Sequence, residues 1–143
     1  MYELPGDVFV CGQLLPAQLQ SLSEQGIQGI INNRPENEAP LQPTSESMGQ
    51  AAQALSLEYH FIPMLGGLSS ELIEASVSAY EKTPRPIVTF CASGMRSAAL
   101  WAFAHVKTMG ADSVIKALEE SPYNLTQIYP LLNEYELERK DSE

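Results

Sequence analysis

Short apolar segments alternate with amphipathic segments along most of the chain, and this order constrains the fold more than any other feature. The apolar segments have the length of β-strands, and each is followed by a segment whose apolar residues recur at helical spacing. Strands are predicted at 8–10, 27–31, 57–62 and 87–90, and helices at 16–25, 44–55, 69–82, 97–109, 112–119 and 125–138. Because parallel strands need a crossover between them, this order predicts an α/β fold with a central parallel four-stranded sheet flanked by helices.

The chain has the size and composition of one ordinary globular domain. Of its 143 residues, 44% are hydrophobic and 18% are charged. No linker, repeat or low-complexity tract interrupts the alternation of strands and helices. We therefore expect a single domain over residues 1–143.

The predicted strand at 87–90 leads into a loop that combines a cysteine, small residues and an arginine. The loop reads Cys91-Ala92-Ser93-Gly94-Met95-Arg96. The small residues allow successive N–H groups to face one anion, and the next helix directs its positive end to the same point. This environment lowers the pKa of a thiol and favours the thiolate, which is the nucleophilic form. We therefore interpret the loop as the active site.

Each residue of this loop has an expected role. Arg96 presents a planar guanidinium that can bind two oxygens of a tetrahedral anion. The predicted catalytic residues are Cys91 and Arg96, and the predicted anion-binding residues are Ala92, Ser93, Gly94, Met95 and Ser97. The Ser97 hydroxyl could hydrogen-bond the thiolate or protonate it later. A buried structural cysteine followed by a surface arginine is the alternative, which the coincidence of strand, turn, arginine and helix disfavours.

A second arginine begins a long loop between the predicted strand at 27–31 and the predicted helix at 44–55. Prolines and asparagines are concentrated in this loop, and loops of such length are often functional. We include Arg34 among the predicted anion-binding residues, as a second clamp over the cysteine loop. A surface arginine paired with Glu36 or Glu38 is the alternative.

The charge of the chain limits its partners. Lys and Arg total 8 against 18 Asp and Glu, so the formal net charge is −10. Nucleic acids and anionic membranes bind basic surfaces, and neither is an expected partner. Two histidines and two distant cysteines have no metal-site spacing, so no metal or cofactor is expected. The expected partner is a small anionic substrate or a phosphorylated molecule, and the oligomeric state is left open.

Cysteine content and hydropathy favour a cytoplasmic protein. Two cysteines in a domain of this size do not form a disulfide framework. There is no signal-peptide pattern and no apolar run long enough to span a bilayer. Removal of a leader ahead of Met1 stays an open alternative.

Several segments carry a family resemblance. In order, they are Val10-Cys11-Gly12-Gln13, Ile30 to Pro35 with Glu38, Gln42-Pro43, Tyr59 to Pro63, and Phe90 to Trp101. Over nearly its whole length, the chain resembles the bacterial family described as the phosphatase-like domain of beta-lactamase hydrolase-like proteins. The resemblance implies the fold of tyrosine and dual-specificity protein phosphatases and a phosphatase-like hydrolase activity. Members of the family have also been labelled sulfurtransferases.

Two departures from tyrosine phosphatases bear on the chemistry. Those enzymes have His-Cys, five residues and then Arg, whereas this chain has Phe90 before the cysteine and four residues before Arg96. The shorter loop is similar to the Cys-x-x-Gly-x-Arg loop of rhodanese-type sulfurtransferases. Phosphatases of this type also place a general-acid aspartate before the cysteine, but the equivalent loop here, 63–68, contains no acid. Glu71 or Glu74 could substitute, although both are expected to be exposed helix residues.

Three functions stay open at this point. The first is a cysteine-dependent phosphatase, slow for lack of a general acid or limited to aryl phosphates. The second is a rhodanese-like sulfurtransferase that forms a persulfide on Cys91, and the third is a non-catalytic, anion-binding pseudophosphatase. Cys11 either approaches Cys91 as a resolving thiol or, as is commoner, is only a buried structural thiol. Asn32 and Asn33 are expected to shape their turn by local backbone bonds.

Overall fold

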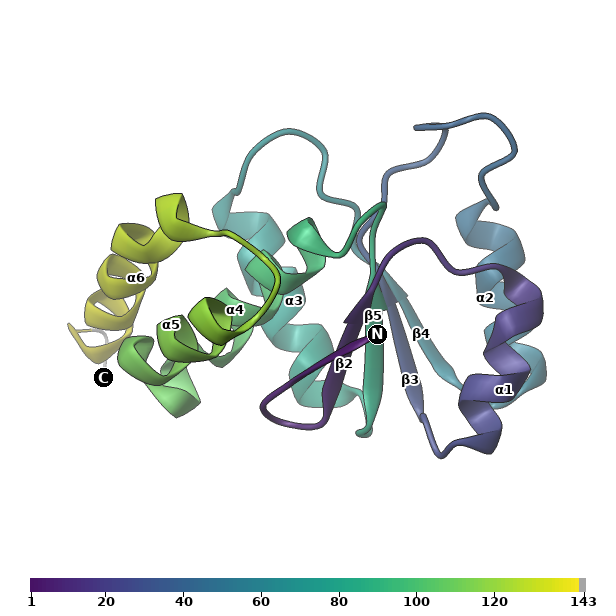
Figure 1. Ribbon diagram of the computed structural model, residues 1–143, viewed down its shortest axis with the longest axis horizontal. Coiled ribbons are helices and arrows are strands. Elements are labelled where there is room, and N and C mark those ends of the chain that lie inside the picture. The colour runs from purple at the N-terminus through teal and green to yellow at the C-terminus, as the bar shows by residue number, and fades with distance from the viewer. Residues whose placement is uncertain (142–143) are drawn as a thin grey trace.

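The computed structural model describes the backbone of residues 1–141 and the side chains of residues 1–138. Its centre is a five-stranded sheet with the order β1-β2-β5-β3-β4 (Figure 1). The strands are β1 (Tyr2–Leu4), β2 (Val8–Cys11), β3 (Gly29–Asn32), β4 (Glu58–Phe61) and β5 (Ile87–Phe90). The last four run parallel to one another, which confirms the α/β class.

The prediction of a four-stranded, wholly parallel sheet was wrong, because a fifth strand lies at the edge. β1 pairs with β2 in antiparallel register, with Leu4 opposite Val8. Gly6 and Asp7 join the two strands with φ angles of 91° and 60°, as a tight hairpin turn requires. The sequence analysis did not predict this strand, because it has only three residues, of which only Leu4 is buried.

Helices cover both faces of the sheet (Figure 1). One face carries α1 (Leu19–Glu24), which follows a 3-10 turn at Pro16–Gln18, and α2 (Ser45–Ala54). The other carries α3 (Ser70–Lys82), α4 (Met95–Met109), α5 (Ala111–Glu120) and α6 (Tyr129–Asp141), the last preceded by a 3-10 turn at Thr126–Ile128. All six predicted helices are present.

The two central strands are buried on both faces. Every residue of β3 and β5 is buried, as expected for a parallel sheet between two helical layers. Ile31 and Ile87 join the core beneath α3 and α4, whereas Ile30 and Val88 join the core beneath α1 and α2. This alternation fixes the register of the strands that end at the candidate site.

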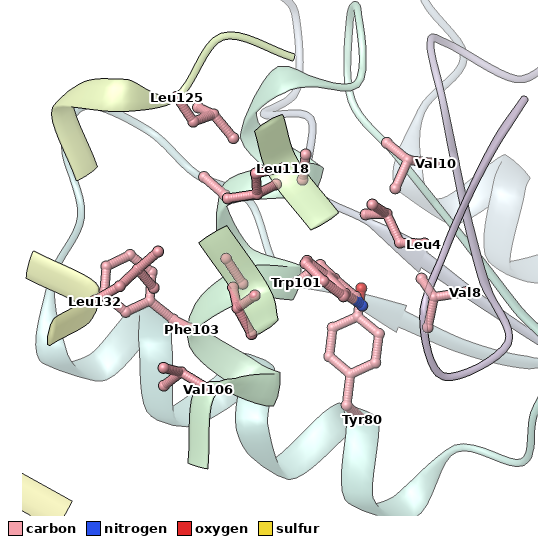
Figure 2. Packing of buried hydrophobic residues seen from close by; sticks show 14 of the residues in the cluster. Leu4, Val8, Val10, Tyr80, Trp101, Phe103, Val106, Leu118, Leu125 and Leu132 are labelled. Atoms are coloured by element: carbon pink, nitrogen blue, oxygen red, sulfur yellow. The ribbon is translucent and has the colours of Figure 1, made fainter. Parts of the chain in front are cut away.

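α4 lies at the centre of the larger core (Figure 2). Nine of its residues are buried, and it packs against α3, α5 and α6. Trp101 is fully buried, stacks on His105, and donates from its indole N–H to the Pro5 carbonyl at 3.2 Å. These contacts fix the position of α4, and therefore of its N-terminus, relative to the sheet.

The four parallel strands end at one edge of the sheet, and the loops that follow them gather there (Figure 1). These loops are residues 12–15, 33–44, 62–69 and 91–94. Ligands of α/β proteins bind at this edge. Within the described residues, no helix combines the length and apolar character needed to cross a membrane.

Candidate active site

The cysteine loop, residues 91–96, comprises the link between β5 and α4 and the first two residues of α4. Gly94 has a φ of 101°, and α4 begins at Met95 rather than at the predicted Ser97, so Arg96 belongs to the first helical turn. The Gly94 amide donates a hydrogen bond to Cys91 Sγ at 3.1 Å. The sulfur therefore lies in a turn of inward-facing amides at the positive end of a 15-residue helix.

The surroundings of the two thiols affect their acidity in opposite ways. Burial opposes ionisation of Cys91, but the amides of Ser97, Ser93 and Gly94 and the Ser97 hydroxyl interact with the sulfur. Together they hold the pKa of Cys91 below its ordinary value. Burial raises the pKa of Cys11 to about 11, and the neighbouring Cys91 adds to the rise. Cys91 is therefore the more acidic of the two thiols.

Arg96 is held by a carboxylate from another loop. Its Nη1 and Nη2 donate to Glu38 Oε2 and Oε1 at 2.9 and 2.8 Å, and Nη1 also donates to the Met64 carbonyl at 3.3 Å. The hydrogen bonds from Arg96, assisted by Arg34, hold the pKa of Glu38 below its ordinary value, so its carboxylate is ionised at neutral pH. Glu38 is the main cause that raises the pKa of Arg96 above its ordinary value, and the nearby Cys91 adds to the rise.

Arg34 is connected to the cysteine loop through Glu38. Its Nε donates to Glu38 Oε1 at 3.1 Å, and its Nη1 donates to Gln13 Oε1 at 3.0 Å. The pairing with Glu38 that was weighed for Arg34 is therefore present, while the direct clamp on an anion stays a prediction. A polar network of Gln13, Arg34, Glu38 and Arg96 connects the loops after β2 and β3 with the start of α4.

Asn33 is buried and makes hydrogen bonds to β5, to the loop after β4 and to α4. Its hydrogen-bond partners are the backbone of Phe90, Met64 and Ile62 and the hydroxyls of Thr89 and Ser97. The prediction of local backbone bonds is confirmed for Asn32, whose side-chain oxygen accepts from the Arg34 amide at 2.9 Å. The prediction was wrong for Asn33, whose side chain bonds to Ile62, Thr89 and Ser97, all distant in the sequence.

The other residues of the cysteine loop that were predicted to bind an anion differ in their exposure to solvent. Ala92, Ser93 and Met95 are exposed, whereas Gly94 and Ser97 are buried. The loop after β2 packs closely on the cysteine loop, because a Cβ at Gly12 would lie 2.8 Å from the Ala92 carbonyl oxygen. The two thiols, Cys11 and Cys91, are not joined by a disulfide.

The loop before α3 supplies a carbonyl group to the site. It is the Met64 carbonyl that accepts from Arg96, while Glu71 and Glu74 are exposed near the start of α3, as predicted. The carboxylate that pairs with Arg96 therefore comes from Glu38, in the loop after β3, and not from Glu71 or Glu74. Across the part of the chain that the structure describes, no group of three or more His, Cys, Asp or Glu is placed to hold a metal ion.

Three residues of the site were not predicted as such: Gln13, Asn33 and Glu38. Pairing of Arg34 with Glu36 or Glu38 was one alternative from the sequence, and the structure shows the pair with Glu38. No local pattern indicated that the same carboxylate would reach Arg96, 58 positions further along the chain. The roles of Gln13 and Asn33 likewise depend on which loops meet at the sheet edge.

Comparison with known proteins identifies the family. A family model for the phosphatase-like domain of beta-lactamase hydrolase-like proteins matches residues 2–108. The chain belongs to this family. The match includes the sheet and all four loops of the candidate site but ends before α5 and α6, so it is shorter than the resemblance in sequence implied.

Individual relatives agree with this assignment. The beta-lactamase hydrolase-like protein of Agrobacterium fabrum is 34% identical over 96 residues, which are 64% of this chain and 22% of that protein. The matched region is therefore less than a quarter of the length of that relative.

Two solved structures show the same fold. A candidate phosphatase from Neisseria meningitidis has a TM-score of 0.74 at 23% identity, with 94% of each chain covered. The core catalytic domain of the PP-IP phosphatase SIW14 from S. cerevisiae, in complex with citrate, has a TM-score of 0.67 at 16% identity, with 99% of this chain and 90% of that chain covered. The predicted phosphatase-like fold is confirmed.

Gly94→Ala should damage the protein more than Gly66→Ala. Both glycines have positive φ angles, 101° and 80°, so alanine is strained at either position. A Cβ at Gly66 would meet nothing within 4 Å, whereas a Cβ at Gly94 would lie 2.7 Å from the Tyr123 hydroxyl. Urea denaturation should show a loss of about 1 kcal/mol for Gly66→Ala and about 2–3 kcal/mol for Gly94→Ala. Equal losses would show that the Tyr123 contact costs nothing.

Proposed function

We propose that the chain is a cysteine-dependent phosphohydrolase with Cys91 as the nucleophile. The observation that carries this proposal is the Cys91 sulfur, which accepts from the Gly94 amide at the N-terminus of α4 and interacts with Arg96. Membership of a phosphatase-like family and the phosphatase-like fold support it. The citrate bound to the yeast phosphatase core supports a small anionic or phosphorylated substrate.

The geometry suits a two-step reaction. The Cys91 thiolate attacks phosphorus, the bond to the leaving oxygen breaks, and Arg96 and the loop amides bind the non-bridging oxygens. Water then attacks the phosphocysteine, phosphate departs, and the thiolate is restored. The Ser97 hydroxyl, which interacts with the sulfur, would stabilise the thiolate as it leaves. Arg34 would act indirectly. It donates a hydrogen bond to the Glu38 carboxylate, and that carboxylate in turn positions Arg96.

The leaving group should be one that departs without a proton. The loop 63–68 contains no acid. Glu38 is ionised and its oxygens accept from two arginines, so it is a poor proton donor in this arrangement. Absence of a general acid typically costs roughly 10²–10⁴-fold in rate. We therefore expect aryl phosphates, which leave as phenolates, to react faster than alkyl phosphates.

The length of the cysteine loop favours a second candidate, a sulfurtransferase. With four residues between Cys91 and Arg96, the loop suits a single sulfur atom better than a phosphoryl group. In this reaction the thiolate attacks the outer sulfur of thiosulfate, sulfite leaves, and a persulfide forms on Cys91. Cyanide then takes the sulfur as thiocyanate and restores the thiolate.

One experiment separates these two candidates. The wild-type protein is assayed with an aryl phosphate and, separately, with thiosulfate plus cyanide, and the intact protein is weighed after brief exposure to each donor. The phosphatase proposal predicts phosphate release and no persulfide. Sulfur turnover with a mass increase of one sulfur atom, and no phosphate release, would overturn it. Neither activity would leave only an anion-binding module.

Anion binding has its own test. Phosphate or sulfate should raise the melting temperature of the wild-type protein, because a ligand that binds only the folded state stabilises it. Arg96→Ala should abolish this rise, since the guanidinium is the cationic side chain that interacts with the Cys91 sulfur. Lys116→Ala is the control, because Lys116 lies on α5, away from the sheet edge. An unchanged shift in Arg96→Ala would exclude Arg96 as an anion ligand.

A further inference from the structure

β4 forms one edge of the sheet, and its outer side is unpaired. In the strand order its neighbour is β3, with which it pairs in parallel register. The Ile62 amide donates to the Asn32 carbonyl at 2.8 Å, so the backbone of this position faces β3. Because alternate residues of a strand direct their backbone groups to opposite sides, the N–H and C=O groups of Tyr59 and Phe61 face away from β3. Within residues 1–138, no other segment hydrogen-bonds to these groups, so they are open to a further strand.

β4 lacks the residues that commonly protect a sheet edge. Natural edges often carry a lysine or a proline, whereas β4 has the sequence Glu-Tyr-His-Phe. Its acidic residue, Glu58, is paired within the strand, since His60 Nε2 lies 2.9 Å from Glu58 Oε2. Phe61 is a large apolar side chain and is nevertheless 37% exposed. The edge is therefore suited to a partner strand.

Two residues of this edge, Tyr59 and Phe61, can each exchange both backbone hydrogen bonds with a new strand. On one side of them the Leu57 amide is already used, because it donates to a carbonyl of α2 at 2.9 Å. On the other side Pro63 has no N–H to donate. The free pair matches a second copy of itself in antiparallel orientation, with Tyr59 of each copy opposite Phe61 of the other. Such a contact is two-fold symmetric, as a closed dimer requires.

The same register gives the side chains compatible neighbours. Tyr59 and Phe61 lie on one face of β4, because side chains alternate along a strand. On that face an open groove of about 840 Å³ runs beside Tyr59 and α2, and Gly49 and Gln53 contribute to its lining. Phe61 of the second copy would lie across from Tyr59, at this groove. Aromatic pairs across neighbouring strands stabilise a sheet, so the contact would also bury exposed apolar surface.

The distribution of charge favours this edge as the place where two copies meet. The chain has a net charge of −10, so two copies repel one another over much of their surface. β4 has one acidic residue, Glu58, and in this register it lies opposite Ile62 of the second copy rather than opposite another acid. The two His60 side chains meet at the two-fold axis, each beside its own Glu58. The carboxylates of the two copies are therefore kept apart.

We propose that two copies of this chain pair through β4, in antiparallel register centred on His60, and so join their sheets into one. Because antiparallel pairing reverses the direction of the strands, the two cysteine loops would lie at opposite edges of the joined sheet. β4 leads into the loop whose Met64 carbonyl accepts from Arg96, so the contact would hold the strand that supports that loop. The inference is independent of which group is transferred at Cys91.

The mass of the protein in solution tests for the dimer. Light scattering after size-exclusion chromatography should give twice the mass of the chain at about 100 µM. Phe61→Lys places a charge at the contact and should raise the dissociation constant by about tenfold or more. Leu131→Lys is the matched control, because Leu131 is 46% exposed but lies on α6, and it should leave the mass unchanged. A monomeric wild-type protein, or a dimer unaffected by Phe61→Lys, would overturn the proposal.

Phe61→Pro covers the case in which Phe61→Lys does not fold. Proline removes the outward N–H but no hydrogen bond to β3, and for this reason it is tolerated at sheet edges. The variant should shift the protein to monomer, while circular dichroism shows unchanged secondary structure. A dimer as stable as that of the wild type would show that the Phe61 amide is not part of the contact, and would likewise count against the proposal.

Cross-linking of single cysteines tests the register. The background is Cys11→Ser, in which the remaining Cys91 is 1% exposed. His60→Cys would place two thiols in a non-hydrogen-bonded pair, whose Cα atoms are about 4.5 Å apart and within the range of a disulfide. Oxidised glutathione should convert the two thiols into one intermolecular disulfide and is itself reduced. Glu58→Cys is the control on the same face, and it should stay unlinked because it faces Ile62 of the second copy. Preferential cross-linking of Glu58→Cys, or none in His60→Cys, would exclude this register.

Discussion

Phosphate release from an aryl phosphate should fall by about 10⁴-fold or more in Cys91→Ser, while the protein stays folded and still binds phosphate. A serine hydroxyl is not ionised at neutral pH, so the nucleophile is lost. The amides and the arginine that would bind the anion remain, because the replaced atom is buried and the side chains are similar in size.

The control for this change is Cys11→Ser. Cys11 is the last residue of β2, next to the site, but burial raises the pKa of its thiol to about 11, so it contributes little thiolate at neutral pH. Cys11→Ser should keep at least about half of the wild-type rate, as a residue outside the chemistry would. A loss of less than tenfold in Cys91→Ser would contradict the assignment of Cys91. A comparable loss in Cys11→Ser would show that both thiols take part.

Trp101→Ala should lower the free energy of unfolding by about 3–5 kcal/mol. Trp101 is fully buried in the larger core, where Figure 2 shows it near Leu4, Val8 and Tyr80, so its removal leaves a large cavity. It also removes the stacking on His105 and the hydrogen bond to the Pro5 carbonyl. The free energy of unfolding of a typical domain is about 5–15 kcal/mol, so this loss would remove a large part of the stability.

Trp101→Phe is the matched control. The smaller ring still fills much of the space but cannot donate to Pro5, so we expect a loss of about 1–2 kcal/mol. Urea denaturation followed by circular dichroism measures both variants, because the single tryptophan is the natural fluorescent probe and is removed. A loss below about 1 kcal/mol in Trp101→Ala would show that α4 is not the centre of the core.

The layer architecture could be predicted because its signals are local. Strands β3 and β5 are apolar on both faces, and each is flanked by helical periodicity, so the α/β class follows from short windows of sequence. β1 lacked that signal, since three residues with one buried leucine have no periodicity to detect. Its pairing with β2 depends instead on the turn at Gly6 and Asp7.

The cysteine loop could be predicted for the same reason, whereas its supporting residues could not. Cys91, Gly94 and Arg96 lie within one turn of chain, and their chemistry is evident from their order. Glu38 reaches Arg96 across 58 positions, and Asn33 reaches Ser97 across 64. Such contacts depend on the strand order β5-β3-β4, which brings separate loops together and has no signature in any one segment.

The Glu38 carboxylate already binds the guanidinium of Arg96, so any anion that binds Arg96 must compete with a carboxylate of the same chain. An incoming oxyanion that uses either terminal nitrogen of the guanidinium exchanges with a carboxylate whose effective concentration is set by the chain itself. The measured affinity would then reflect the difference between the binding free energies of the oxyanion and of Glu38 at Arg96, rather than the binding free energy of either one. The same exchange would link occupancy to the conformation of residues 33–44, because an anion that displaces Glu38 removes the contact between that loop and α4.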